Sequence, residues 1–404
     1  MRTAAESPFP QPADGLSPIG AVAEHSFALV LPVCTLLFLS TGPHSAPSAL
    51  LWTLPVWLFI FADFVSPSDR RQPSPDLPSW PFEGLLYLLA GLQIANTAVL
   101  VDMAAQLSWR DAAQIIDSVS NLLAIRILVG TNSCCSGIAV AHELIHRRRR
   151  IPRFLGRLVL CSVWYEHFAV EHLRGHHRHV GTREDPATAR LGETYRSYWR
   201  RTKFAQYRNA WRLENERLGL PVSFPFRRGV VPEPGLGSRD AKPQTSARSA
   251  HPGYQKGAFA NILRLLQHEV LLGTLAQVLL LILIATYGGL PAAGIFLLQA
   301  LAAIRLLEAV NYFQHWGLKK GTKPGQALAA WATDSWFTRH VFVGLARHAD
   351  HHRHSAKAYQ MLEYCGNGPK LPCGYFGMAL LAKSFNRRFQ DIARNELRRY
   401  RQQA

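Results

Sequence analysis

Residues 114–150 read QIIDSVSNLLAIRILVGTNSCCSGIAVAHELIHRRRR, and this stretch decides the fold class. From about Gln114 to Ala141 the residues are mostly apolar, over a length sufficient for an α-helix to cross the hydrocarbon core of a bilayer. The run ends in HELIH and four consecutive arginines, Arg147–Arg150. An apolar helix that ends in imidazoles and a basic cluster predicts a membrane protein with a polar site at the end of its helices.

Apolar runs of similar length recur along the 404-residue chain, separated by Pro-rich and Arg-rich stretches. We predict six transmembrane helices, at about 25–40, 49–65, 83–107, 114–141, 270–287 and 291–312. A weaker run at 154–170 is predicted to be a buried or interfacial helix. Six spans place both termini on one side with the arginine clusters, and the positive-inside rule makes that side cytoplasmic. The predicted fold is an all-α membrane protein: six transmembrane helices with a cytoplasmic helical cap that carries the histidines.

The chain is predicted to form one membrane-embedded domain over residues 25–390. A disordered tail, 1–24, precedes this domain, and a basic tail, 391–404, follows it at the end of a predicted surface helix, NRRFQDIARNELRRYRQQ. Residues 229–257 are low in complexity and are predicted to be a flexible inserted loop.

Charge and cysteine content exclude several functions. The net charge of +18 comes from arginine clusters that flank apolar runs, which favours membrane orientation over nucleic-acid binding. The six cysteines form no C-x-x-C pair, which argues against a fused rubredoxin, zinc ribbon or iron–sulfur module.

Four segments concentrate histidine, and in the predicted topology each lies at the cytoplasmic end of a helix. In HELIH the two histidines are one helical turn apart and share a face. In EHLRGHH a regular helix would bring His172 beside His176 and turn His177 to the side. The other segments are NYFQHWGL and RHADHH. The nine histidines of these segments are His142, His146, His172, His176, His177, His315, His348, His351 and His352.

Their number predicts two metal ions, because three or four protein ligands saturate one ion. Adjacent histidines diverge by about 100° on a helix, so that each of two neighbours can reach a different ion. Imidazole suits iron, zinc, copper and nickel, so ligand type alone leaves the metal open.

HELIH also fits H-E-x-x-H, the zinc-peptidase pattern, with Glu143 as general base. An intramembrane zinc metalloprotease is therefore an alternative function. It would leave the seven other clustered histidines without a role.

Further site residues are predicted from position. Arg305, Glu308, Asn311, Tyr312 and His315 share one side of the sixth predicted span. Glu308 or Asn311 is expected to orient a ligand histidine, with a simple Arg305–Glu308 ion pair as the alternative. Glu143 and Asp350, which lie within histidine segments, are further candidates for contacts to the ligand histidines. Three aromatic residues of the second span are candidates for lining a substrate channel: Trp52, Trp57 and Phe61. Their alternative role is lipid contact or packing.

The four segments resemble the motifs of the integral-membrane di-iron family that includes fatty acid desaturases and alkane hydroxylases, and most of all the alkane 1-monooxygenases. HELIHRR, EHFAVEHLRGHHRHVGTREDPATARLGETY, NYFQHWGL and LARHADHHRHSAKAYQML follow the family order, and LPCGYFGMALLA resembles its C-terminal segment. The similarity covers roughly 50–220 and 265–390. Gln314 and Trp316 depart from the usual Glu and Tyr around the third motif, where NYFQH resembles the xylene-type methyl monooxygenases.

This resemblance implies a fold, a cofactor and a reaction. It implies six transmembrane helices, two iron ions held by the nine histidines, and O₂-dependent hydroxylation of a terminal methyl group in the bacterial inner membrane. Electrons would come from rubredoxin, reduced by an NAD(P)H-dependent flavoprotein, and the basic cytoplasmic surface would attract this acidic carrier. Hydrocarbon would enter from the lipid bilayer. Fatty acyl desaturation or hydroxylation and alkylarene methyl hydroxylation are the alternatives within the superfamily.

Overall fold

The computed structural model describes residues 17–221, 263–320, 330–366 and 368–403. Regular structure within these ranges is helical, with two isolated β-bridges, which confirms the predicted all-α class. The predicted inserted loop, 229–257, and most of the predicted N-terminal tail lie outside the described residues.

Among the described residues, five helical stretches are long and apolar enough to cross a membrane. Several contain consecutive helical elements that differ only in their hydrogen-bond spacing. The stretches are α1–η1–α2 (Pro18–His25, Ser26–Leu29, Val30–Thr41), α3–α4 (Ala46–Leu51, Leu54–Phe64), α5 (Ser79–Ala105), α6–η2–α7–η3–α8 (Ala112–Ala124, Ile125–Val129, Gly130–Asn132, Ser133–Ile138, Ala139–Ile145) and α14 (Glu269–His315).

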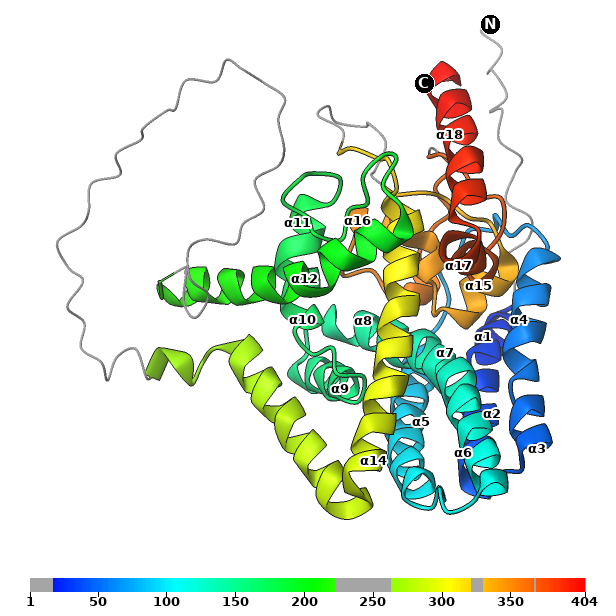
Figure 1. Cartoon of the computed structure of the whole chain (residues 1–404). Helices are drawn as coiled ribbons and strands as arrows, with labels where there is room; N and C mark the ends of the chain where they lie inside the picture. The colour runs from blue at the N-terminus through cyan, green and yellow to red at the C-terminus, as the bar shows by residue number, and fades with distance from the viewer. Residues whose placement is uncertain (1–16, 222–262, 321–329, 367, 404) are drawn as a thin grey trace, which may run out of the picture.

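The fifth and sixth predicted spans both belong to the 47-residue α14. At Gly289 the backbone leaves the helical region, with φ 80° and ψ 170°, and Pro291 follows two residues later. Glycine adopts this left-handed φ without a Cβ clash, and proline cannot continue the helical hydrogen bonds across the bend. The chain therefore turns here, and the second half of α14 runs back along the bundle (Figure 1).

The first span begins earlier than predicted. Helix α1 starts at Pro18, inside the predicted tail 1–24, so that boundary was wrong. Ser17 accepts a hydrogen bond from the Gly20 amide at 3.2 Å, and proline follows at the first helical position. This is a regular helix-start signal, which sequence apolarity alone does not reveal.

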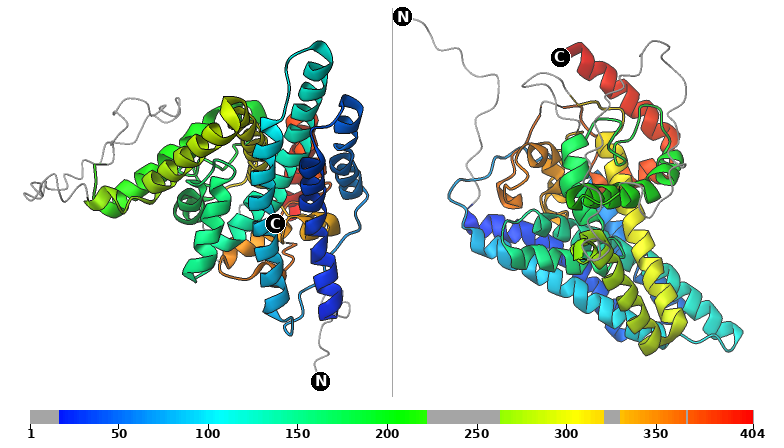
Figure 2. Two further views of the ribbon diagram at one scale, coloured as in Figure 1. Left: turned by 90° about the horizontal axis from the view of Figure 1, so that it is seen from below. Right: turned by 90° about the vertical axis from the view of Figure 1, so that its left-hand side faces the viewer.

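The remaining helices gather mainly at one end of the spans, as Figures 1 and 2 show. The predicted surface helix is confirmed as α18, whereas the weak run 154–170 breaks into α9 and α10 around Trp164, whose φ is 54°. These elements are α9 (Arg150–Cys161), α10 (Phe168–Val170), η4 (Glu171–His176), α11 (His177–His179), α12 (Tyr195–Leu218), α15 (Trp336–Val341), η5 (Leu345–Arg347), α16 (His348–Arg353), η6 (Tyr359–Met361), α17 (Tyr375–Ser384) and α18 (Asn386–Gln403).

The buried core and the exposed apolar side chains divide the spans into two kinds. The stretch from α6 to α8 is 83% buried over its most apolar window, so it forms the centre of the bundle. The other spans are 22–39% buried and expose large apolar side chains such as Leu58, Leu279 and Ile282. An outward-facing apolar surface of this extent fits a multi-pass membrane protein.

Asp63, at the end of α4, ties the spans to the cap. Its buried carboxylate accepts hydrogen bonds from the hydroxyls of Ser335 and Thr338, at 2.9 and 2.7 Å. It also accepts from the backbone amides of Phe376 and Gly377 at the start of α17, at 2.8 and 3.2 Å. One carboxylate thus fixes α4, α15 and α17 together, because leaving any of these buried groups unpaired would be costly.

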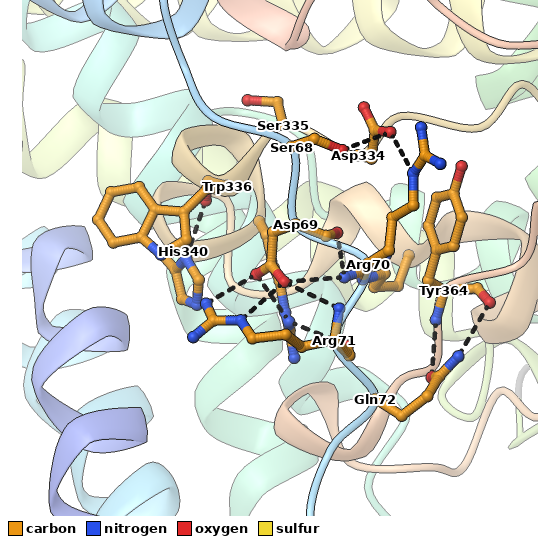
Figure 3. A network of polar contacts seen from close by, with 12 residues as sticks. Ser68, Asp69, Arg70, Arg71, Gln72, Asp334, Ser335, Trp336, His340 and Tyr364 are labelled. Atoms are coloured by element: carbon orange, nitrogen blue, oxygen red, sulfur yellow. Dashed lines mark hydrogen bonds and ion pairs between the residues drawn. The ribbon is translucent and has the colours of Figure 1, made fainter. Parts of the chain in front are cut away.

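A second buried carboxylate, Asp69, lies at the centre of the network in Figure 3. It accepts hydrogen bonds from the guanidinium groups of Arg71, at 3.0 Å, and Arg339, at 2.8 Å, while Arg347 donates to its carbonyl oxygen at 2.7 Å. Burial alone would raise the pKa of Asp69, but the hydrogen bond from Arg71 and the charges of Arg339 and Arg347 hold it well below its usual value. These contacts attach the segment that follows α4 to Arg339 of α15 and to Arg347, the residue before His348.

We predict that Asp69→Asn destabilises the protein by about 3 kcal/mol, because Arg71 and Arg339 lose the charged carboxylate with which they pair in a buried site. The measurement is thermal unfolding in detergent, followed by tryptophan fluorescence. Since the native pKa of Asp69 lies below the ordinary value of about 4, its stabilisation is complete at neutral pH and is lost as the pH falls. The difference between the two proteins should therefore shrink in acid.

Asp334→Asn is the matched control, because Asp334 pairs with Arg70 in the same network at 2.8 Å but the Arg70 side chain is 56% exposed. An exposed pair contributes about 0–1 kcal/mol. Equal destabilisation by the two substitutions would contradict a special role for Asp69.

Candidate metal centre

The four histidine segments meet at the cap end of the spans. HELIH lies on α8 and its C-terminal cap, EHLRGHH on η4 and α11, His315 at the end of α14, and RHADHH on η5 and α16. The structure brings all nine predicted histidines into two groups, and within each group the candidate ligand atoms lie within 4.8 Å of one another. The first group is His142, His146, His172, His177 and His351, and the second is His176, His315, His348 and His352.

In the first group the ring nitrogens converge on one another. Nε2 of His172 lies 3.1 Å from Nε2 of His146 and 2.9 Å from that of His177. Nε2 of His351 lies 3.1 Å from Nε2 of His177. The Nε2 atom of His142 is buried without a hydrogen-bond partner. Such a set of facing lone pairs is the arrangement that a cation would satisfy.

The second group repeats this arrangement with four rings. Nε2 of His348 lies 3.2 Å from Nε2 of His315 and 2.9 Å from that of His352. The His176 ring completes the group, with its centroid 4.9 Å from that of His315.

A π-helical turn decides which histidines of EHLRGHH join which group. It overturns the predicted pairing of His172 with His176, which assumed a regular helix. Residues Glu171–His176 form the π-helix η4, whose wider turn aligns residues five apart rather than four. His172 therefore joins His177 in the first group, whereas His176 belongs to the second. The i,i+4 pair His142–His146 stays together as predicted, and His348 and His352, also four residues apart, share the second group.

Adjacent histidines separate between the groups, as predicted for neighbours on a helix. His176 and His177 fall into different groups, and so do His351 and His352. The groups nevertheless adjoin, since the ring centroids of His177 and His352 are 4.6 Å apart. The arrangement suits two metal ions side by side.

The protonation state of these rings fits metal binding. Burial, together with neighbouring imidazoles, lowers the pKa of His146 to about 3 and that of His177 to about 2. The pKa values of His172, His348, His351 and His352 are also lowered, first by burial and then by the adjacent rings. Neutral imidazole is the form that coordinates a metal, so the donor set is ready for a cation at neutral pH.

Asp185 is an outer residue that the sequence reasoning did not identify. Its buried carboxylate lies 2.9 Å from Nδ1 of His176 and also accepts from Thr188. A carboxylate on Nδ1 fixes the ring so that Nε2 faces the second group. Burial works against ionisation, but the interactions with His176 and Thr188 lower the pKa of Asp185. The available signal was an aspartate shortly after a histidine pair, in the stretch GHHRHVGTREDP.

Two predicted outer residues make other contacts. Glu143 forms an ion pair with Arg147 at 2.8 Å and accepts from the Tyr359 amide at 3.2 Å, which ties HELIH to the segment after RHADHH. Asp350 accepts from Lys357 and from the Glu363 amide, both at 2.9 Å, and so closes the loop beyond α16.

Glu308 and Asn311 lie in a polar layer beneath the histidines. Glu308 accepts hydrogen bonds from Tyr165, Tyr198 and Gln206, at 2.7, 2.9 and 2.9 Å, and from Asn311 at 3.3 Å. These contacts join α14 to α12 across the bundle. The guanidinium of Arg305 lies over the ring of Trp199, 5.5 Å from its centroid.

Gln314 and Trp316, which flank His315 and replace the usual Glu and Tyr of the family, each make a local hydrogen bond that explains the residue. The Gln314 amide donates to the Tyr375 hydroxyl, which itself donates to the Leu345 carbonyl at 3.0 Å. An ionised carboxylate at position 314 could not donate in this chain of hydrogen bonds. The Trp316 indole donates to the Glu193 carbonyl at 3.0 Å, where a phenol would have different geometry.

The predicted channel residues lie on the outer side of α3 and α4. Trp57 and Phe61 are 51% and 64% exposed, and Trp57 also lines a cavity of about 350 Å³ between α4, α6, α14 and α17. Trp52 packs near Phe38 and His44. A separate cavity of about 300 Å³, between α5 and α8, reaches His146 of the first group.

Comparison with known proteins agrees with this geometry. A fatty acid desaturase family model matches residues 119–372, which include all nine histidines. The chain is 34% identical to alkane 1-monooxygenase 1 of Pseudomonas aeruginosa, over 63% of this chain and 58% of that protein. It is 32% identical to alkane 1-monooxygenase 2 of the same species, over 78% of this chain and 74% of that protein. The hydroxylase component of the xylene/toluene monooxygenase of Pseudomonas putida is 24% identical over 58% of this chain and 54% of that protein.

The family-model match begins within α6 and ends shortly before α17, and it includes every segment that contributes to the two histidine groups. The chain therefore belongs to the fatty acid desaturase family, among its alkane 1-monooxygenase members.

Proposed function

We propose that this protein is a membrane di-iron monooxygenase that hydroxylates the terminal methyl group of medium- or long-chain n-alkanes to 1-alkanols. The observation that carries the proposal is the pair of adjoining histidine groups at the end of apolar spans. A methyl C–H bond has no acidic proton and no leaving group, so acid–base groups cannot cleave it. Cleavage of this bond requires O₂ to be reduced to a strong oxidant, and two bound iron ions would supply that chemistry.

The nine histidines are proposed to hold the irons, five at one ion and four at the other. Asp185 orients His176, and the Glu143–Arg147 pair fixes the HELIH turn against the segment after α16. Burial of the rings excludes bulk water from the reacting end of the substrate. The outward-facing apolar spans would admit a hydrocarbon directly from the bilayer.

The topology belongs to the proposal as well. We place both halves of α14 across the membrane, which gives six crossings and puts the cap and the arginine clusters on the cytoplasmic side of a bacterial inner membrane. Electrons would come from rubredoxin, since the chain has no C-x-x-C pair that would form an internal iron–sulfur or rubredoxin-type carrier. A basic cavity of about 620 Å³ beside Asp185, lined by Arg183, Arg190, Lys319 and Arg401, is a docking place for such an acidic carrier.

An alkylarene methyl hydroxylase is the second candidate. Gln314 and the similarity to the xylene/toluene monooxygenase component favour it. It would use the same two histidine groups with a different substrate.

We predict that cells expressing the protein with a rubredoxin and its reductase convert octane or hexadecane to the 1-alkanol, with one oxygen atom from labelled O₂. Mass spectrometry of products from octane, hexadecane, p-xylene and a fatty acid is the measurement. Labelled benzyl alcohol would shift the function to the second candidate, and an alkene product would indicate desaturation. A lack of any oxidised product would contradict the proposal.

His352→Ala and His172→Ala should each lower the iron bound per chain and abolish turnover, because each removes one imidazole from a group. Asp185→Asn should weaken iron binding by about tenfold or more through loss of ring orientation. Metal analysis of the purified proteins measures both effects. His354→Ala is the matched control, since His354 lies beside His352 but in neither group. Full iron content in His352→Ala would argue against its role as a ligand.

Rubredoxin-coupled turnover should fall steeply between low and high salt, because long-range attraction between the basic cap and an acidic carrier is screened. Arg183→Glu/Arg190→Glu should lower coupled turnover by about tenfold at low salt and flatten the salt dependence. Arg110→Glu serves as the control, since Arg110 lies in the loop between α5 and α6, away from the cap. Turnover that does not change with salt would exclude electrostatic steering.

A further inference from the structure

Two cavities on the outer side of the bundle share a pair of cations. The smaller, of about 350 Å³, lies between α4, α6, α14 and α17, and the larger, of about 820 Å³, lies between α12, α14, α17 and α18. Arg305 and Lys383 line both, so they stand where the two cavities meet. Neither cavity is lined by any of the nine histidines.

The smaller cavity is an apolar groove that ends in positive charge. Val56, Ile60, Leu306 and Phe376 form much of its wall, and Arg126 joins Arg305 and Lys383 as its charged lining. No acidic side chain lines the groove among the residues that the structure describes. Its rim faces outward, since Trp57 and Leu123 are 51% and 41% exposed.

The cations at this point lack anionic partners in the part of the chain that the structure describes. No hydrogen bond or ion pair to a carboxylate is formed there by Arg126, Arg305 or Lys383, and the Arg305 guanidinium stacks on Trp199 instead. The larger cavity adds Arg196, Arg387 and Arg394, of which Arg394 is paired with Asp391. Burial and the charges of Arg305 and Arg126 lower the pKa of Lys383, as expected for a cation in an uncompensated positive field.

The cluster lies where the cap meets the spans. Arg305 precedes His315 on α14 by ten residues (315 − 305), or about 15 Å along the helix. At this level α17 of the cap packs against α4 and α14 of the spans. Cations at the boundary between an apolar surface and a polar cap are typical sites for anionic headgroups.

We propose that an anionic phospholipid binds here, with its phosphate between Arg126, Arg305 and Lys383 and one acyl chain along the apolar groove. The larger cavity takes the remainder of the headgroup, and its volume is in the range of ligand-binding cavities. A carboxylate on a free fatty acid shares the negative charge and the tail, but it leaves the 820 Å³ cavity with its additional arginines unfilled. The site is independent of the proposed oxidation chemistry, because it contains none of the nine histidines.

The test uses the full-length protein purified in mild detergent. Native mass spectrometry should show one phospholipid retained per chain, and titration with phosphatidylglycerol should raise the unfolding temperature more than phosphatidylcholine does. Arg126→Gln/Lys383→Gln should weaken phosphatidylglycerol binding by about tenfold or more, since two contacts to the phosphate are lost. Lys383→Arg, which keeps the charge, and Arg110→Gln, which removes an exposed cation elsewhere, should bind as the unmodified protein does.

A second measurement needs no variant. A phosphatidylglycerol analogue with a photoreactive group in one acyl chain should label peptides from α4, α6 or α17 of the unmodified protein. Labelling confined to other helices, equal stabilisation by phosphatidylcholine, or a bound species that lacks phosphorus would each overturn the proposal. Equal binding by Arg126→Gln/Lys383→Gln and the unmodified protein would overturn it too.

Discussion

The convergence of nine imidazoles in a buried space is the constraint on which the rest of the structure depends. Nε2 of His172 and Nε2 of His348 each face two neighbouring ring nitrogens at about the distance of a hydrogen bond, and a single N–H can donate to only one of them at a time. Burial favours the neutral rings, so the groups cannot relieve this by charging. The protein must therefore supply enough packing elsewhere to hold the rings together until a cation compensates them.

That packing comes from segments far apart in the chain. Helix α8 is the end of the most buried span, and α14 brings His315 to the same level after a turn at Gly289. The RHADHH helix is short and cannot position itself, because a six-residue helix has little stability of its own. Asp69 holds the residues before this helix, whereas Glu143 and Asp350 hold the residues after it. Buried carboxylates thus fix the geometry of the histidine groups although most of them touch no histidine of either group.

The outer surface has two different environments. Around the spans it is apolar and suits hydrocarbon, either a lipid chain or the proposed substrate. Around the cap it is basic, and the cavity beside Asp185 and the cluster at Arg305 and Lys383 lie at different places on it. One positive surface would therefore serve both proposed anionic partners, the soluble carrier above the cap and the lipid headgroup where the cap meets the spans.

The sequence by itself determined the helical class, the four histidine segments and the separation of adjacent histidines into two groups, because apolar length and the 100° step of a helix are local properties. It could not determine how the histidines of EHLRGHH are divided between the groups, since residue spacing does not reveal the π-turn in η4, which packs against α12. It also missed Asp185, whose approach to His176 requires the chain to fold back after α11. The roles of Glu308, Asp63 and Asp69 likewise come from contacts across more than a hundred residues, which only the tertiary structure brings together.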